Sequence, residues 1–525
     1  MIERASIEGK VFHRGGVLAL CDDDLRASAD QHLRSLVRRD LVRPDAPDVA
    51  GEDAFRFRHL LIRDAAYGSI PKETRAELHA RFADWLERAA TERSELDEIL
   101  AYHLDRSFTL RSELGPLDDA TVAVGRRAAE LLSATGDRAA ERGDTLAAAA
   151  MWQRAFELLP DEEPSGPALA AAAAEAFGSG GSFERKGRVI APALERAVRS
   201  GSDEAVAGLA VIAATSGAAL DPVANPAPRI IELAAACEAA IGAAPQYRRL
   251  LGWARLDAGV AHNWLGLMTE AARLCEQAAA DGEAVGDRFL ARAARNRGFV
   301  VQVLGTRPIS DLATDAESEH TFELQGVALA LAGRIDEARA FGERALTRAR
   351  ELGILSAAEP VFAGWTELLA DRPDLAEPFL REGYARASAG FAASIAGYFA
   401  RALHELGRDD EAIEILAAHP DTPSDDYEAI GLERSAHAVI LASRGELQEA
   451  ERLAREGVAA LEPTEDLMRH GETLLALATV LRAGGREEEA VTTAQEALAL
   501  FERKGDVPDA RRTRSFLGHR SHAQP

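Results

Sequence analysis

The stretch LASRGELQEA, residues 441–450, decides the fold because versions of it recur along the chain. Each version has small or apolar residues, a turn centred on Gly, and an acidic segment that ends in Ala. Close copies are LALAGRIDEA (329–338), LHELGRDDEA (403–412) and LRAGGREEEA (481–490), and looser copies are AERGDTLAA (140–148), NWLGLMTEA (263–271) and LADRPDLA (369–376). The last five copies end 36 to 40 residues apart, which is a period typical of helical hairpins.

The positions within each copy predict how a hairpin is built. A Gly five residues before the Ala can end the first helix in the left-handed conformation, and the acidic residues suit the start of the second helix. Asp371 takes the place of this Gly in one copy. The repeat-defining residues are Gly143 with Ala148, Gly266 with Ala271, Gly333 with Ala338, Gly407 with Ala412, Gly445 with Ala450, Gly485 with Ala490, and Ala376.

This pattern resembles the tetratricopeptide repeat over roughly residues 125–515, although the copies are degenerate between 165 and 260. The resemblance implies an all-α fold, a superhelix of helical hairpins over residues 121–518 whose concave surface binds a protein partner or an effector. We expect a separate module at 1–120 and a short tail at 519–525. The alternative is a helical domain without repeats, in which the Gly and Ala spacing is fortuitous.

The composition narrows the class of partner. Asp and Glu number 86 against 61 Lys and Arg, and the net charge of −25 argues against nucleic acid as a partner. The three cysteines are too few and too far apart for a disulfide framework or a zinc site. The chain has neither a signal-peptide pattern nor an apolar run long enough to span a membrane. We therefore expect a cytoplasmic protein that does not enter the membrane.

Residues 1–92 do not follow the repeat. Asp22 to Asp24 can cap a helix that runs to about Arg39, with Leu25 and Leu33 on one face. Residues 41–44 and 54–59 then predict two short strands around a polar loop. Helices followed by a two-stranded wing form the order of a small winged-helix-like module. A helix from His59, a break at Ile70-Pro71 and a second helix should follow.

The stretch FRFRHLLIRDAAYGSIPKETRAELHARFADWLE, residues 55–87, resembles the region after the nucleotide-binding core in bacterial signal-transducing ATPases of the STAND type. In that family the core is joined to tetratricopeptide repeats, often with a class III adenylate or guanylate cyclase domain or a LuxR-type DNA-binding domain. The resemblance implies a sensor and protein-interaction arm, with a separate NTPase core as a possible partner. The alternative is the regulatory half of a cyclase-linked ATPase or of a LuxR-type regulator.

This sequence departs from the family at the phosphate-binding loop. Its Gly-Lys pair, Gly9-Lys10, has Arg4 where the first Gly of G-x-x-x-x-G-K-[ST] is needed and Val11 where the Ser or Thr is needed. We therefore expect no enzymatic activity, no metal and no cofactor in this chain, with ATP or ADP bound only if another chain supplies the core. A truncated gene model, a split gene and a stand-alone regulator remain open.

His59 and Asp64, in FRHLLIRD, are the nucleotide-sensing candidates. The resemblance implies that His59, at the start of a helix, contacts the phosphates of bound ADP, and a helix N-terminus suits that contact. The alternative is a structural His59 that only bonds a backbone carbonyl. A DNA-reading helix at Arg26 to Arg39 is disfavoured because neighbouring aspartates cancel its charge. The basic residues from Arg503 onward should either suit the negative end of the last helix or make a weak contact with an anion.

Overall fold

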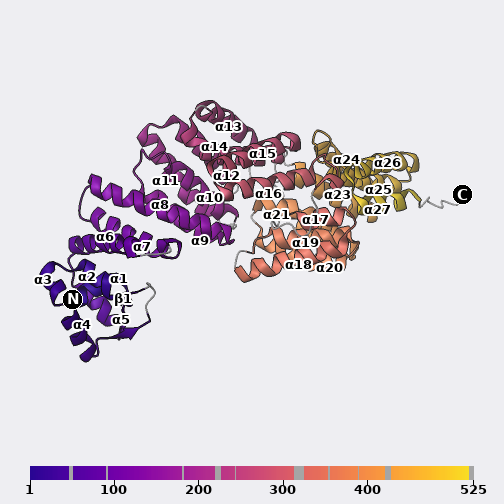
Figure 1. Cartoon of the computed structure of the whole chain (residues 1–525). Helices are drawn as coiled ribbons and strands as arrows, with labels where there is room; N and C mark the ends of the chain where they lie inside the picture. The colour runs from indigo at the N-terminus through magenta and orange to yellow at the C-terminus, as the bar shows by residue number, and fades with distance from the viewer. Residues whose placement is uncertain are drawn as a thin grey trace. The chain divides into compact units, whose positions relative to one another are not determined.

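The computed structural model describes residues 1–46, 51–89, 93–179, 183–218, 226–242, 244–312, 324–352, 355–387, 389–419 and 427–518. In these residues the chain forms 27 α-helices, two short 3-10 helices and one three-stranded sheet, so the predicted all-α class is confirmed (Figure 1). The tail expected at 519–525 lies outside the described residues.

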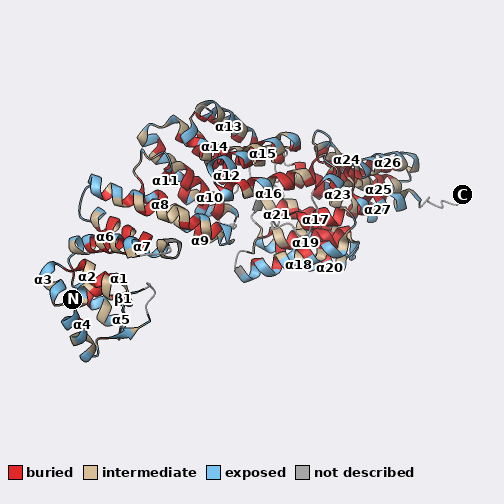
Figure 2. Cartoon of the chain, in the orientation of Figure 1, coloured by how far each residue is buried: buried red, intermediate tan, exposed pale blue. Residues whose placement is uncertain are grey.

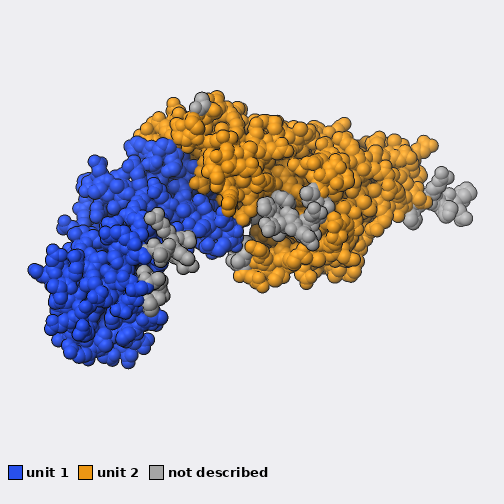
Figure 3. Space-filling model, in the orientation of Figure 1, with its two compact units in different colours: residues 1–173 blue, residues 174–525 orange. Residues whose placement is uncertain are grey.

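The chain divides into two compact units, residues 1–173 and residues 174–525, which are described separately (Figure 3). The helix Gly166–Ser179, α10, contains the division. The module boundary expected near residue 120 falls at the start of another helix inside the first unit, and it stays a prediction.

Unit 1 begins with four short helices and three short strands, in the region where the sequence predicts a winged-helix-like module. Its elements are α1 (Ile2–Glu8), β1 (Val11–His13), α2 (Arg14–Leu20), α3 (Asp23–Ala27), α4 (Ala29–Arg38), β2 (Val42–Asp45) and β3 (Ala54–Phe57). Phe12 and Phe57, whose ring centroids lie 5.2 Å apart, join Val17 and Leu33 in a buried core. Burial of these side chains against the helices holds the β2–β3 hairpin in place.

The two predicted strands of the wing are present as β2 and β3, and a third strand, β1, pairs with β3 in the antiparallel order β1-β3-β2. One expectation for this module needs correction. The helix expected from Asp22 to Arg39 is two helices, α3 and α4, broken at Ser28. The Ser28 hydroxyl donates to the carbonyls of Asp24 and Leu25, and this local bonding competes with the helix. Asp22 does cap α3, since its carboxylate accepts from the Leu25 N–H.

The rest of unit 1 consists of packed helices. They are α5 (Leu60–Gly68), α6 (Lys72–Ala89), α7 (Arg93–Ser112), α8 (Asp119–Glu141) and α9 (Thr145–Leu158), followed by the first part of α10. The predicted break at Ile70-Pro71 separates α5 from α6. Consecutive helices from α6 to α9 pack on one another.

Unit 2 continues this pattern. Its elements after α10 are α11 (Phe183–Ser200), α12 (Asp203–Ala218), α13 (Ala227–Ile241), η1 (Pro245–Tyr247), α14 (Arg248–Trp264), α15 (Met268–Val285), α16 (Arg288–Leu304), η2 (Ile309–Asp311), α17 (Gln325–Leu331), α18 (Ile335–Leu352), α19 (Ala358–Leu369), α20 (Pro373–Arg386), α21 (Ala389–Glu405), α22 (Asp409–Ala417), α23 (Tyr427–Ser443), α24 (Leu447–Leu461), α25 (Leu467–Ala483), α26 (Glu487–Lys504) and α27 (Val507–Gly518). From α17 to α26 the helices pack as antiparallel hairpins.

The hairpin turns have the geometry expected of a tetratricopeptide-like array. The turn glycines all have a φ between 71° and 85°, and Asp371, which takes their place once, has a φ of 55°. At Gly445 the backbone N–H donates to the Ala442 carbonyl, and the next N–H donates to the Leu441 carbonyl. These two bonds end the first helix and start the second.

The alanines that end the repeated phrase lie in the seams between helices. Ala148, Ala271, Ala338, Ala376, Ala412, Ala450 and Ala490 are all exposed by 1% or less. Figure 2 shows buried residues along the faces where neighbouring helices meet. Small side chains at these positions let the paired helices approach closely.

Candidate functional site

His59 lies at the N-terminus of α5, as the sequence predicts. Its backbone is extended, with a φ of −135°, and its side chain makes no capping bond to the helix. The imidazole is exposed, and so is Asp64, whose carboxylate accepts from Arg63 at 3.1 Å. The geometry leaves both residues accessible, and their role in nucleotide sensing stays a prediction.

Two large apolar side chains follow His59 at the same exposed helix start. Leu60 is 53% exposed and Leu61 is 80% exposed, whereas Ala66 on the other face of α5 is buried. Single exposed leucines are common on protein surfaces, but two in succession beside an accessible imidazole form a small apolar surface. We call His59, Leu60 and Leu61 the α5 surface.

The first helices of the last hairpins form a closed ring in unit 2. Contacts join α17 to α19, α19 to α21, α21 to α23 and α23 to α25, and α27 contacts α17. Arg482 of α25 links this helix to α27 by donating to the Phe516 carbonyl at 2.7 Å. An open array would leave the last of these helices far from the first.

The inside of this ring is filled by the ring's own side chains. The rings of Trp365 and Tyr398 lie 5.1 Å apart, and the Arg469 guanidinium lies 5.6 Å from the centre of the Trp365 ring. Arg401 of α21 reaches Glu472 of α25 at 3.4 Å. From α17 to α27 the concave face, which was expected to bind a partner, is therefore filled by side chains of the chain itself. That a partner binds elsewhere on the array stays a prediction.

Carboxylates are concentrated in this interior. Asp506 and Asp509 are each 1% exposed, and the Glu472 side chain is 11% exposed. One oxygen of each of these three carboxylates has no hydrogen-bond partner in the described part of the chain. Burial, with repulsion from Asp509, raises the pKa of Glu472 to about 7 and raises the pKa of Asp506 well above its ordinary value.

Lys504, at the end of α26, connects the ring to the C-terminal end of α16. It is fully buried, and its ammonium donates to the carbonyls of Gln302 at 2.9 Å, Gly305 at 2.7 Å and Arg307 at 2.7 Å. Burial lowers the pKa of Lys504 to about 8, so the group is still largely charged at pH 7. The sequence predicts that the basic residues after Arg503 suit the end of the last helix. Lys504 instead caps the C-terminal end of α16, which is an earlier helix.

Sequence reasoning also missed a histidine pair in unit 1. His79 of α6 and His103 of α7 are fully buried, and their Nδ1 atoms lie 2.8 Å apart. The Tyr67 hydroxyl lies 2.9 Å from Nε2 of His79. The available signal was a histidine on the apolar face of each of two successive helices.

The described residues include no group of three or more His, Cys, Asp or Glu side chains placed to hold a metal ion. Cys21, Cys237 and Cys275 are buried free thiols. Among the described helices, none combines the length and the apolar character needed to cross a membrane.

Known protein families and curated proteins give no match to this chain. Solved structures do resemble it. A structure of the APC/C hetero-tetramer Cut9-Hcn1 has a TM-score of 0.45 at 12% identity and covers 87% of this chain and 91% of its own. A STAND protein with a tetratricopeptide repeat sensor from Pyrococcus horikoshii has a TM-score of 0.33 at 13% identity, over 80% of this chain and 62% of its own. Yeast Tom70 has a TM-score of 0.32 at 12% identity, over 86% and 98%.

Proposed function

We propose that the chain is the non-catalytic sensor and protein-interaction arm of a STAND-type signalling ATPase. In this proposal a protein partner or an effector binds the repeat array. The N-terminal module then passes that state to an NTPase core, which lies outside residues 1–525.

The observation that carries the proposal is the α5 surface. His59 stands exposed at a helix N-terminus, where free backbone N–H groups favour a phosphate. Leu60 and Leu61 beside it are apolar groups that a docked protein would remove from water. A phosphate-facing imidazole bordered by apolar contacts suits a surface that docks on a nucleotide-binding core.

The repeat array supplies the interaction part of the proposal. Hairpins stacked in sequence present long exposed surfaces, and such arrays commonly serve as binding scaffolds. Because the ring from α17 to α27 is packed inside, we place the partner on exposed helices of the array rather than in the centre of that ring.

The test uses the full chain together with a STAND-type NTPase core loaded with a fluorescent ADP analogue. The rate of analogue release from the core is measured with and without the chain. We expect the chain to change this rate, His59→Ala to reduce that effect, and Leu61→Ser to weaken association between the two proteins.

His32→Ala is the matched control, because His32 is an exposed histidine on α4 of the same module and lies outside the α5 surface. It should behave as the unmodified chain does. If the chain binds the core and the release rate stays the same with and without His59, the sensing role is wrong. If no association is found, the proposal as a whole is wrong.

A further inference from the structure

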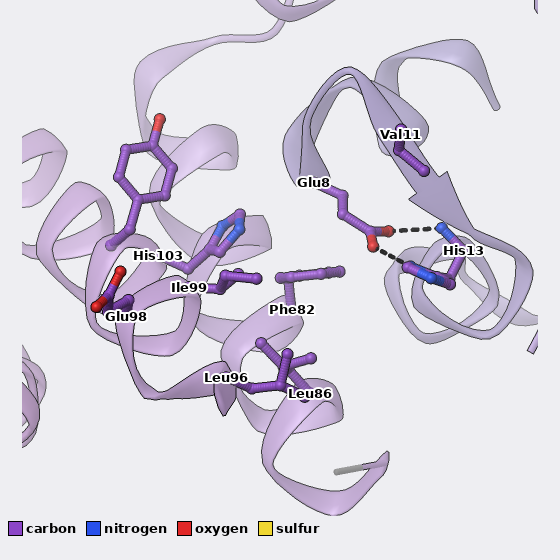
Figure 4. A pocket seen from close by; sticks show the side chains of 10 residues that line it. Glu8, Val11, His13, Phe82, Leu86, Leu96, Glu98, Ile99 and His103 are labelled. Carbon is purple, nitrogen blue, oxygen red and sulfur yellow. Dashed lines mark hydrogen bonds and ion pairs between the residues drawn. The ribbon is translucent and has the colours of Figure 1, made fainter. Parts of the chain in front are cut away.

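A cavity of about 330 Å³ lies in unit 1, with α1 and β1 on one side and α6 and α7 on the other (Figure 4). The part of its wall that comes from α6 is apolar and consists of the almost completely buried side chains of Phe82 and Leu86. A volume of this size is at the lower end of the range for small-molecule sites. The side chains that a ligand can reach from solvent therefore decide what the cavity binds.

The reachable part of the wall lies mainly on α7. Glu98 is exposed, Ile99 is 43% exposed and Tyr102 is 48% exposed, and all three line the cavity. We call these three residues the α7 rim. Exposed apolar side chains beside a cavity leave water when a ligand covers them, which favours binding. The α7 rim thus offers an accessible apolar contact next to an accessible carboxylate.

Two carboxylates stand on opposite sides of the cavity, and only one of them is matched (Figure 4). Both oxygens of Glu8 are bonded to His13, one to the imidazole Nδ1 at 2.5 Å and the other to the backbone N–H at 2.8 Å. Glu98 has no hydrogen bond or ion pair within the described part of the chain, and the described lining includes no Lys or Arg. The charge of Glu98 is therefore not neutralised by the cavity itself.

This charge favours a cation and disfavours an anion. Tyr102 follows Glu98 by four positions in α7, so the two side chains lie on the same face of the helix. A cation beside the carboxylate is then close to the aromatic ring, whose face attracts positive charge. The net charge of −25 also raises the concentration of cations near the surface of the protein.

We propose that the cavity binds a small organic cation, a primary ammonium with an apolar body. The ammonium lies against Glu98 and Tyr102, and the body covers Ile99 and the apolar wall. All three residues of the α7 rim are open to solvent, so the ligand reaches them in the structure as it stands. This site is independent of the proposed role in a STAND system.

Three fluorinated probes of similar size test the proposal by fluorine NMR on the full chain. They are 4-fluorobenzylamine, which is a cation at pH 7, 4-fluorobenzyl alcohol, which is neutral, and 4-fluorobenzoate, which is an anion. We expect the amine to bind about 3- to 30-fold more tightly than the alcohol, the combined effect of one exposed ion pair and one cation–π contact. The benzoate should bind most weakly. High salt should reduce the advantage of the amine, because salt screens an exposed charge.

Two variants place the probe in this cavity. Glu98→Gln should abolish the preference for the amine, and because Glu98 is exposed the fold should be unaffected. Ile99→Trp should fill the space beside the rim and abolish binding of both the amine and the alcohol. Glu130→Gln is the matched control, since it removes an exposed carboxylate from α8 of the same unit, outside the cavity, and should retain the preference.

Several results would overturn the proposal. Equal binding of the amine and the alcohol would show that Glu98 and Tyr102 do not select a cation, and no binding of the amine would show that the cavity holds no such ligand. A preference for the amine that persists in Glu98→Gln, or in Ile99→Trp, would place the cation site elsewhere on the protein.

Discussion

Lys504 shows how one residue can hold distant parts of the chain together. Its ammonium bonds three carbonyls that lie 197 to 202 positions earlier in the sequence. In the sequence it is one of several basic residues near the C-terminus, and nothing local distinguishes it from its neighbour Arg503. Only the fold reveals that Lys504 is buried and Arg503 is exposed.

Lys504→Met should destabilise unit 2 by about 2–4 kcal/mol, because the carbonyls of Gln302, Gly305 and Arg307 lose the ammonium to which all three are bonded. Urea denaturation of the full chain measures the loss. Hydrogen exchange should show faster opening near residues 302–309 and in α27. Arg503→Met removes a neighbouring exposed charge and should change the stability little. Equal stability of the two variants would show that the three bonds contribute nothing.

Glu472 makes the stability of unit 2 depend on pH. Its pKa is about 7 in the folded chain, above the ordinary value of 4.5, because burial and Asp509 disfavour the charged form. The folded state therefore holds the extra proton between these pH values. The resulting stabilisation is complete below about pH 4.5 and is lost as the pH rises through about 7.

In the unmodified chain the free energy of unfolding should fall between about pH 5 and pH 8. Glu472→Gln should make this fall smaller by about 1–3 kcal/mol. Burial and repulsion from Glu175 raise the pKa of Asp257 to about 7. Asp257 therefore adds a fall of the same sign in both proteins. The difference between the two pH curves reports Glu472 together with Asp506, because the Glu472 charge is one of the causes that raise the pKa of Asp506. Glu488→Gln, at an exposed position on α26, should leave the curve unchanged. Parallel curves for all three proteins would contradict the assignment.

At the level of elements, the turns could be predicted well from the sequence because a left-handed residue leaves a clear local signal. Even the exception, Asp371, lies at a turn as predicted. The short strand β1 could not be predicted, since three residues are too few to show alternation. The break at Ser28 was missed because a serine hydroxyl that bonds its own helix looks, in the sequence, like any other polar position.

Helix contacts give a prediction with an internal control. At Gly397 an added Cβ would lie 2.5 Å from Leu432 Cβ and 2.6 Å from its carbonyl carbon, so α21 and α23 would have to move apart. At Gly342 in α18 the nearest atom is 3.9 Å away. Gly397→Ala should therefore destabilise the chain by about 1–3 kcal/mol.

Gly342→Ala should instead stabilise it by about 0.5–1 kcal/mol, because Ala is the better helix former. Thermal or urea unfolding of the full-length variants distinguishes the two cases. Similar effects at both positions would mean that the close approach of α21 and α23 does not limit side-chain size.

At the scale of the whole molecule, the period of the sequence predicts which helices are neighbours but not that the array closes. The bond from the Tyr427 hydroxyl to the Asn263 carbonyl and those of Lys504 join hairpins far apart in the chain. Such contacts leave no periodic signal. The His79–His103 pair was hidden for a similar reason, since a buried histidine is recognised only when its partners are known.

The chain alone should not bind ATP. Gly9 and Lys10 lie between α1 and β1, with Arg4 and Val11 at positions where a phosphate loop needs Gly and Ser or Thr. Titration calorimetry of the full chain with ATP and Mg²⁺ should give no binding heat. Micromolar affinity that depends on Mg²⁺ would show that the chain contains a nucleotide site unlike the phosphate loop.

The closed ring limits how this protein can change in evolution. Open arrays gain or lose a unit by duplication or deletion, because each unit contacts mainly its neighbours. Here an extra hairpin anywhere between Gln302 and Lys504 would carry the ammonium past its three carbonyls and move α27 away from α17. We therefore expect the number of hairpins in this segment to be fixed, and length variation to accumulate in the hairpins before α14, whose Asn263 carbonyl accepts from Tyr427.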